Sequence, residues 1–139
     1  MEEVIAVDTN ILVRFFARDD EAAYATAELL IVGDSVLLSP TVLLETEWVL
    51  RAKYGFSKRE ILNALAGLLA LPNVETLDQE SVELAIDWSS SLRLDFADAL
   101  HLAQARSATA FATFDTDLVR KARSLTNTIH VAAPGQLQR

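Results

Sequence analysis

The chain has 139 residues, the length of one domain, of which 51% are hydrophobic and 23% charged. These values exclude a disordered acidic tail and a fibrous repeat. With 12 Lys and Arg against 20 Asp and Glu, the formal net charge is −8, which argues against a protein that simply coats nucleic acid through a basic surface. The chain has no cysteine, so disulfides, thiolate metal sites and cysteine nucleophiles are excluded.

Short apolar runs alternate with helical segments along the chain. In chain order, the pattern predicts a strand at residues 4–7, helices at 9–17 and 19–31, a strand at 36–38, helices at 40–53 and 57–71, a strand at 74–77, helices at 78–89 and 95–105, a strand at 110–113, a helix at 115–125 and a strand at 128–132. This alternation is typical of a parallel sheet covered by helices on both faces. We therefore expect one α/β domain over residues 1–139, a three-layer α/β/α fold with a central, mostly parallel sheet.

No segment has the composition of a targeting signal or a membrane span. The chain opens with Met-Glu-Glu, which lacks the basic start of a secretory signal. The uncharged stretch at residues 61–73 is interrupted by Asn63, Gly67 and Pro72 and is too short to cross a bilayer. We expect a cytoplasmic protein with no membrane association.

Acidic residues follow two of the predicted strands. Ligand sites in open α/β sheets form beyond the carboxyl ends of the strands. Asp8 comes directly after the first strand, and Asp115 and Asp117 come after the strand at 110–113. Asp98 lies near the start of the helix at 95–105. Each acid also has a simpler interpretation, as a helix cap or a first-turn acid favoured by the helix dipole, and both interpretations stay open.

Glu45 lies inside a helix, and its neighbours at helical spacing are mostly apolar. We therefore expect its carboxylate on an apolar side of that helix. A buried, unpaired carboxylate costs on the order of several kcal/mol unless it takes up a proton or finds a cation. A buried salt bridge to Arg51 or Arg93 is the alternative. Glu47, one turn before Arg51, is expected at the rim.

The case for a functional site is the conjunction of these acids. Two carboxylates in one crevice repel by about 4 kcal/mol at a separation near 4 Å and an effective dielectric constant near 20. Mg²⁺ or Mn²⁺ would compensate this repulsion, because these ions prefer carboxylate and water oxygens. Ions held in this way bind phosphate oxygens and activate water for an in-line displacement, so the acids favour phosphodiester hydrolysis. Four further residues are candidates either to orient the carboxylates or to serve as turn and cap residues: Thr9, Asn10, Asp95 and Thr113.

These motifs resemble those of the PIN domain family. Asp8-Thr9-Asn10 after a strand, Glu45 within residues 44–50, Asp98 within residues 95–100 and Asp115 within residues 112–118 occur in the family's order. The length and the helix after Asp8 are similar to those of VapC-type toxins of prokaryotic toxin–antitoxin systems. The resemblance covers essentially the whole chain.

The resemblance implies a Mg²⁺- or Mn²⁺-dependent endoribonuclease that hydrolyses RNA with metal-activated water and acts as a toxin. Its catalytic and metal-binding acids would be Asp8, Glu45, Asp98 and Asp115, with Asp117 as an additional ligand or as the alternative to Asp115. The resemblance also implies a homodimer and a VapB-like antitoxin that blocks the site. Two alternatives stay open: a catalytically silent RNA-binding or interaction domain, and a metal-dependent nuclease in RNA or DNA processing.

An acidic protein that holds RNA needs a local positive rim. The basic residues near the proposed acids are Arg14, Arg18, Arg51, Lys53, Arg93, Arg120, Lys121 and Arg123. For any single one of them, a solvated charge or an ion pair with a nearby acid is the favoured interpretation. Aromatic residues near the motifs are expected in the core, with base stacking as the alternative: Phe15, Phe16, Trp48, Phe96 and Phe114.

Overall fold

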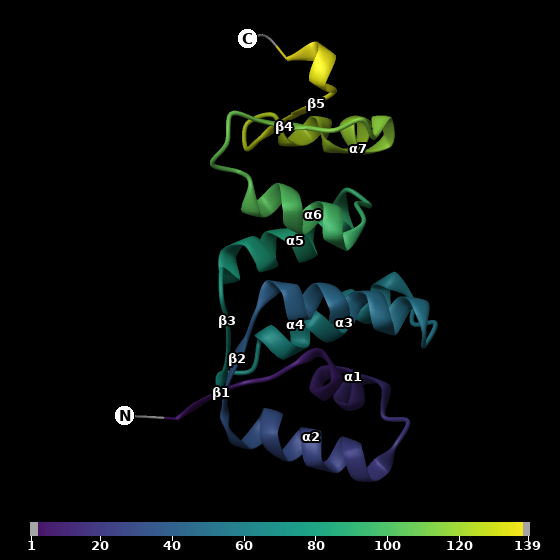
Figure 1. Cartoon of the computed structure of the whole chain (residues 1–139), viewed down its shortest axis with the longest axis vertical. Helices are drawn as coiled ribbons and strands as arrows, with labels where there is room; N and C mark the ends of the chain where they lie inside the picture. The colour runs from purple at the N-terminus through teal and green to yellow at the C-terminus, as the bar shows by residue number, and fades with distance from the viewer. Residues whose placement is uncertain (1–2, 138–139) are drawn as a thin grey trace. The chain divides into compact units, whose positions relative to one another are not determined.

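The computed structural model of the chain describes residues 3–137 (Figure 1). The first two residues, part of the chain start considered above, lie outside this range. The chain divides into two compact units, unit 1 (Met1–Gln79) and unit 2 (Glu80–Arg139).

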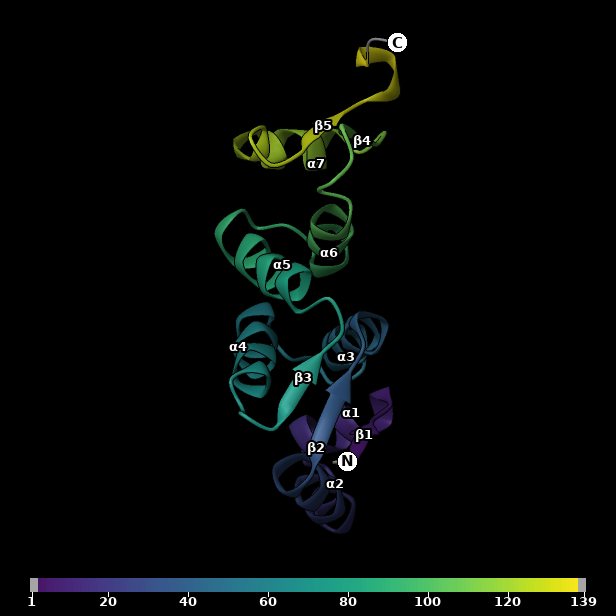
Figure 2. The same ribbon diagram turned by 90° about the vertical axis from the view of Figure 1, so that its left-hand side faces the viewer.

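Unit 1 is built around a parallel sheet of three strands. Its elements are β1 (Val4–Ala6), α1 (Thr9–Ala17), α2 (Glu21–Gly33), β2 (Ser35–Leu38), α3 (Pro40–Ala52), α4 (Lys58–Leu69) and β3 (Val74–Thr76). The strands pair in the order β1-β2-β3, with Ile5 opposite Val36 and Leu37 opposite Glu75. Figure 2 shows β2 and β3 side by side and pointing in the same direction. The core of the unit is aliphatic and includes Leu12, Leu43 and Leu65, all fully buried.

Side-chain caps start the helices of unit 1. Ser39 caps α3 directly after β2, with Pro40 at the first helical position. Ser57 and Glu60 form the predicted capping box at the start of α4. Asp8 caps α1 directly after β1. Because a short strand leads almost at once into a capped helix, polar side chains come to lie at the carboxyl ends of β1 and β2.

Unit 2 contains the second parallel pair of strands. Its elements are α5 (Gln79–Ser91, which begins at the last residue of unit 1), α6 (Phe96–Gln104), β4 (Ala110–Ala112), α7 (Thr116–Lys121), a 3₁₀ helix at Ala122–Leu125, β5 (His130–Ala132) and a 3₁₀ turn at Pro134–Gln136. β4 and β5 are parallel, with Phe111 opposite Val131. Val82, Leu100 and Leu102 are fully buried in its core.

The predicted order of helices and strands is confirmed, and every strand pair in the described part of the chain is parallel. Most boundaries differ from the prediction by one or two residues, and two of the differences have a clear local cause. The second helix begins two residues later, at Glu21, because Asp20 is its cap. The helix expected at 115–125 ends at Lys121 and continues as a 3₁₀ helix, a common tightening of a last turn. Within residues 3–137, no helix is both long and apolar enough to cross a membrane.

Candidate active site

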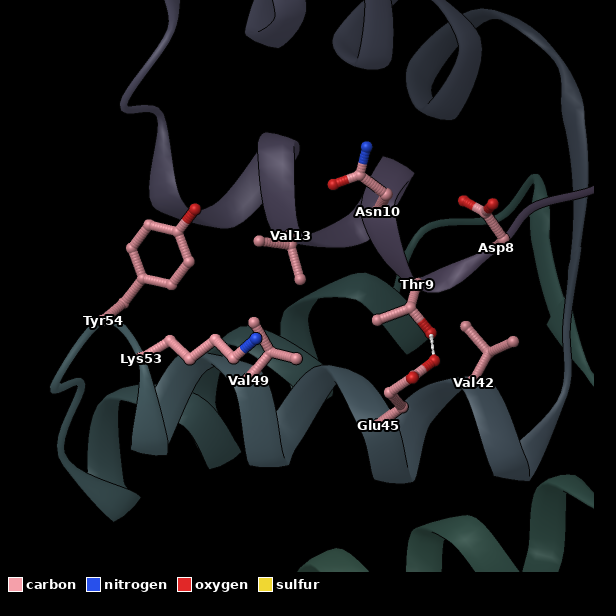
Figure 3. A pocket seen from close by; sticks show the side chains of 9 residues that line it. All are labelled: Asp8, Thr9, Asn10, Val13, Val42, Glu45, Val49, Lys53 and Tyr54. Carbon is pink, nitrogen blue, oxygen red and sulfur yellow. Dashed lines mark hydrogen bonds between the residues drawn. The ribbon is translucent and has the colours of Figure 1, made fainter.

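A cavity of about 510 Å³ lies in unit 1 (Figure 3). The start of α1, one face of α3 and the two residues after α3 form its wall. The residues that line it are Asp8, Thr9, Asn10, Val13, Val42, Glu45, Val49, Lys53 and Tyr54. The cavity therefore brings together Asp8 and Glu45, two of the predicted catalytic acids, with Thr9 and Asn10, two of their predicted supporting residues.

Asp8 is both a helix cap and a cavity residue. Its Oδ1 accepts a hydrogen bond of 3.3 Å from the backbone N–H of Ile11, so the capping interpretation is correct. The same side chain is exposed and lines the cavity. A carboxylate has about four acceptor positions, so one capping bond leaves the rest for other partners. The two interpretations of Asp8 are compatible.

Glu45 is exposed, so the prediction of a buried carboxylate is wrong at this position. Val42 and Val49, its neighbours on α3, line an open cavity instead of covering the carboxylate. The hydroxyl of Thr9 donates a hydrogen bond to Glu45 Oε1 and thereby links α1 to α3 (Figure 3). The buried acid of α3 is Glu47.

Glu47 is only 6% exposed, so the prediction of a rim position is also wrong. Arg51, one turn further along α3, donates to both of its carboxylate oxygens, at 2.8 and 3.3 Å. This pairing satisfies the buried charge of Glu47. Arg51 is therefore an ion-pair partner of Glu47.

The donors in this cavity suit a hard divalent cation. Two carboxylates, a hydroxyl and a side-chain amide all offer oxygen atoms. Mg²⁺ usually keeps several waters and binds proteins through one or two carboxylates. Within residues 3–137, no group of three or more His, Cys, Asp or Glu side chains is arranged to hold a metal ion. Asp8 and Glu45 offer carboxylate oxygens of the kind that such an ion binds, but they do not form a closed cage.

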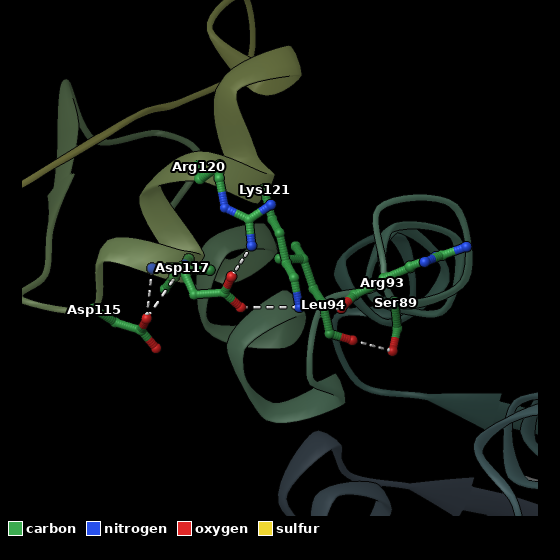
Figure 4. Close-up of polar contacts among 8 residues, drawn as sticks. Ser89, Arg93, Leu94, Asp115, Asp117, Arg120 and Lys121 are labelled. Atoms are coloured by element: carbon green, nitrogen blue, oxygen red, sulfur yellow. Dashed lines mark hydrogen bonds and ion pairs between the residues drawn. The ribbon is translucent and has the colours of Figure 1, made fainter.

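In unit 2, the predicted site residues are also cap and turn residues. Asp95 caps α6 and accepts a hydrogen bond of 3.4 Å from the backbone N–H of Asp98. Asp115 caps α7, accepting from the N–H groups of Asp117 at 3.0 Å and Leu118 at 3.1 Å (Figure 4). Thr113 accepts from the N–H of Asp115 at 3.0 Å. The local geometry of unit 2 thus confirms the capping alternative for Asp95 and Asp115.

Asp98 carries an electrostatic cost that capping does not explain. Partial burial raises the pKa of its carboxyl, and the negative charges of Asp95 and Asp115 raise it further. His101 and Lys121 act in the opposite direction but leave a net rise. A cation near Asp98 would stabilise the ionised form of this carboxyl, because it would offset the neighbouring negative charges.

Asp117 is already paired within its own helix. Its carboxylate accepts a hydrogen bond from Arg120 and forms an ion pair of 3.0 Å with Lys121 (Figure 4). These two cations lower the pKa of Asp117. Lys121 also donates to the backbone carbonyl of Arg93, at 3.1 Å. The charge of Asp117 is therefore balanced locally, whereas Asp115 forms no ion pair within residues 3–137.

The favoured interpretation of the basic residues as ion-pair partners is confirmed for five of them. The pairs join Arg14 to Asp19, Arg18 to Glu21, Arg51 to Glu47, and both Arg120 and Lys121 to Asp117. Within residues 3–137, Lys53, Arg93 and Arg123 have no carboxylate within 4.0 Å of their charged groups. Of these three, Lys53 is the one that lines the cavity.

Tyr54 is a cavity residue that no sequence motif indicated. Its hydroxyl donates a hydrogen bond of 3.1 Å to Asp19, and this bond, together with burial, raises the pKa of Tyr54. Lys53 could be anticipated, because Glu45, Val49 and Lys53 follow one another at four-residue spacing. Tyr54 lies beyond the helix, where the chain turns at Gly55 with φ of 69°.

The prediction that the aromatic residues near the motifs are core residues holds for Phe96, which is 2% exposed. It is wrong for Trp48, which is 50% exposed, and for Phe114, which is 87% exposed. Phe15 and Phe16 are of intermediate exposure and contact each other edge-on.

Residues 5–124 match the family model of the PIN domain. The chain belongs to the PIN domain family. PIN domains have a three-layer α/β/α fold and are generally metal-dependent nucleases. The matched range includes Asp8, Glu45, Asp98 and Asp115. None of the curated proteins matches the chain significantly.

Proposed function

We propose that this PIN domain protein is a Mg²⁺- or Mn²⁺-dependent endoribonuclease and the toxin of a VapBC-type toxin–antitoxin pair. The observation that carries the nuclease proposal is the cavity of unit 1, which Asp8 and Glu45 both line. The chain also belongs to a family whose members are generally metal-dependent nucleases. The proposed catalytic acids are Asp8, Glu45, Asp98 and Asp115.

In this proposal, Asp8 and Glu45 help to hold the divalent ion, which when bound would act as a Lewis acid on the phosphodiester and its attacking water. Thr9 acts as a positioning residue, because its hydroxyl holds the Glu45 carboxylate in one orientation. The helical cap keeps the Asp8 carboxylate at the start of α1. Asp98 and Asp115 complete the set by their match to the family pattern, and the raised pKa of Asp98 supports a role beside positive charge.

The choice of RNA and the toxin role rest on the resemblance of the Asp8 segment and the following helix to VapC-type toxins. With that role we propose a homodimer, a cytoplasmic location and a VapB-like antitoxin that blocks the cavity.

The purified protein should be incubated with single-stranded RNA, duplex RNA and DNA, in Mg²⁺, in Mn²⁺ and in EDTA. We expect cleavage of RNA with either ion and none in EDTA, and no cleavage by an Asp8→Asn preparation, which controls for contaminating nuclease. Cleavage of DNA but not RNA would remove the toxin proposal. Metal-dependent cleavage of neither polymer would leave a binding or interaction domain.

The toxin role has its own test. Expression of the wild-type chain should arrest growth of a bacterial host, and expression of Asp8→Asn should not. Co-expression of a small reading frame adjacent in the genome should restore growth, and its product should co-purify with the toxin. An active ribonuclease that leaves growth unchanged would favour RNA processing instead.

A further inference from the structure

The cavity of unit 1 has two chemically different ends. Asp8 and the hydrogen-bonded pair of Thr9 and Glu45 lie at one end, and Tyr54 lies at the other (Figure 3). Val13 and Val49 lie between them in this view, and the side chain of Lys53 extends from the Tyr54 end. At about 510 Å³, the cavity is within the range of small-molecule sites and is larger than a hydrated metal ion requires.

Lys53 offers an available positive charge in this cavity. Six other basic residues of the described chain are engaged in ion pairs. Within residues 3–137, Lys53 forms no ion pair, and its ammonium lies 5.8 Å from the centre of the Trp48 ring, an exposed contact that leaves its N–H donors available. A lysine in this condition suits a phosphate group, to which it binds as a point charge.

Tyr54 offers a ring whose orientation is already set. Its hydroxyl is bonded to Asp19, and Asp19 in turn pairs with Arg14 at 3.4 Å. The side chain is still 37% exposed, so the ring is not covered by the protein. A ring held in place loses little conformational entropy when a flat ligand stacks on it.

We propose that Lys53 and Tyr54 form a nucleotide subsite for an unpaired RNA strand, next to the acids that serve cleavage. Lys53 binds a phosphate of the strand, and the ring of Tyr54 stacks on a base. This inference rests on the proposed endoribonuclease function and adds two residues that would hold its substrate. The stacking contact needs an unpaired strand, because a base within a duplex is stacked on its neighbours and its face is not free for Tyr54.

Binding of a fluorescent single-stranded RNA of mixed sequence, measured in EDTA as a function of salt, separates the two contacts. Lys53→Met should weaken binding about fivefold and lower the slope of log K against log salt by about 0.7, as expected for one lost phosphate contact. Tyr54→Leu should weaken binding about tenfold and leave the slope unchanged. Lys53→Arg, which keeps the charge, should keep most of the affinity. Tyr54→Phe, which keeps the ring but loses the bond to Asp19, should lose less affinity than Tyr54→Leu, and both results would exclude misfolding as the cause.

Arg59→Met is the matched control, because Arg59 is an exposed cation of the same unit that does not line the cavity. If Lys53→Met and Tyr54→Leu bind RNA as Arg59→Met does, while the wild type cleaves RNA, the subsite is overturned and the nuclease proposal stands. If the wild type does not cleave but these two variants still lose affinity and Arg59→Met does not, the subsite stands and the catalytic proposal fails. Equal losses for duplex and single-stranded RNA would overturn the stacking role of Tyr54.

Discussion

The two units hold their acids in different ways. In unit 1, Asp8 and Glu45 line an open cavity, and within residues 3–137 neither forms an ion pair. In unit 2, Asp117 is balanced by Arg120 and Lys121, whereas the pKa of Asp98 is raised by burial and by neighbouring acids. Helix caps occur in both units, so capping by itself does not distinguish an available carboxylate from a satisfied one. The partners of each carboxylate make that distinction.

The largest loss of RNA cleavage should come from removing one carboxylate charge in each unit. Asp8→Asn and Asp98→Asn should each lower RNA cleavage by more than about 100-fold, because each removes a proposed electrostatic contribution to the transition state. Neither should unfold the protein, since Asn caps α1 as well as Asp does and Asp98 is not the cap of α6. Cleavage assays and urea unfolding measure both properties, with the exposed Asp87→Asn as control. A large loss of stability in either variant would leave only the structural role.

The same substitution at Asp98 carries a further expectation about stability. The pKa of the Asp98 carboxyl is raised in the folded state, so its ionised form lowers the free energy of unfolding at neutral pH. This loss is relieved as the pH falls through the folded-state pKa. Asp98→Asn should therefore be at least as stable as the wild type at neutral pH.

A second pair of substitutions compares the two acids at the start of α7 in unit 2. Asp115→Asn should strongly reduce cleavage, whereas Asp117→Asn should have a smaller effect, because the charge of Asp117 is already balanced by two cations. Both variants should be assayed at saturating Mg²⁺ and their melting temperatures compared. If only Asp117→Asn abolishes cleavage, the assignment of the fourth acid to Asp115 is wrong.

The hydrogen bond between Thr9 on α1 and Glu45 on α3 predicts an intermediate loss of cleavage. Thr9→Val keeps the shape of the side chain but removes the hydroxyl that donates to Glu45. We expect cleavage to fall about tenfold, with a higher Mg²⁺ requirement, as is typical when a residue that orients a metal ligand is lost. Thr9→Ser, which keeps the donor, is the control. Equal activity of all three proteins would show that Glu45 needs no positioning.

The smallest effect concerns the capping box of α4, whose residues do not line the cavity. The carboxylate of Glu60 accepts from the backbone N–H of Ser57, and this bond lowers the pKa of Glu60 below its ordinary value of 4.5. The resulting stability is present above that ordinary value and is lost as the pH falls through the lower, folded-state value. Glu60→Gln should therefore be less stable than the wild type at neutral pH and equally stable in strong acid, with unchanged cleavage. Thermal melting across pH measures this, and a difference independent of pH would contradict it.

Much of the fold could be predicted because its signals are local. Ser39-Pro40 and the Ser57–Glu60 capping box mark helix starts within a few residues of chain, and the short apolar runs mark strands. Asp8 and Glu45 could be selected for the cavity because the family motifs are also short segments. The burial of Glu45 and Glu47 was predicted the wrong way round, since apolar neighbours at helical spacing do not say whether another element covers them.

Residue identity and short-range spacing were sufficient to place the caps, the alternation of strands and helices, and the acids of the PIN family pattern. Folding in three dimensions assigned each acid its partners: Thr9 for Glu45, Arg51 for Glu47, and Arg120 with Lys121 for Asp117. It also brought Tyr54 to the cavity through a bond to Asp19, which is 35 residues away in the chain. Charge compensation and burial depend on distances between atoms, and those distances exist only once separate segments pack against each other.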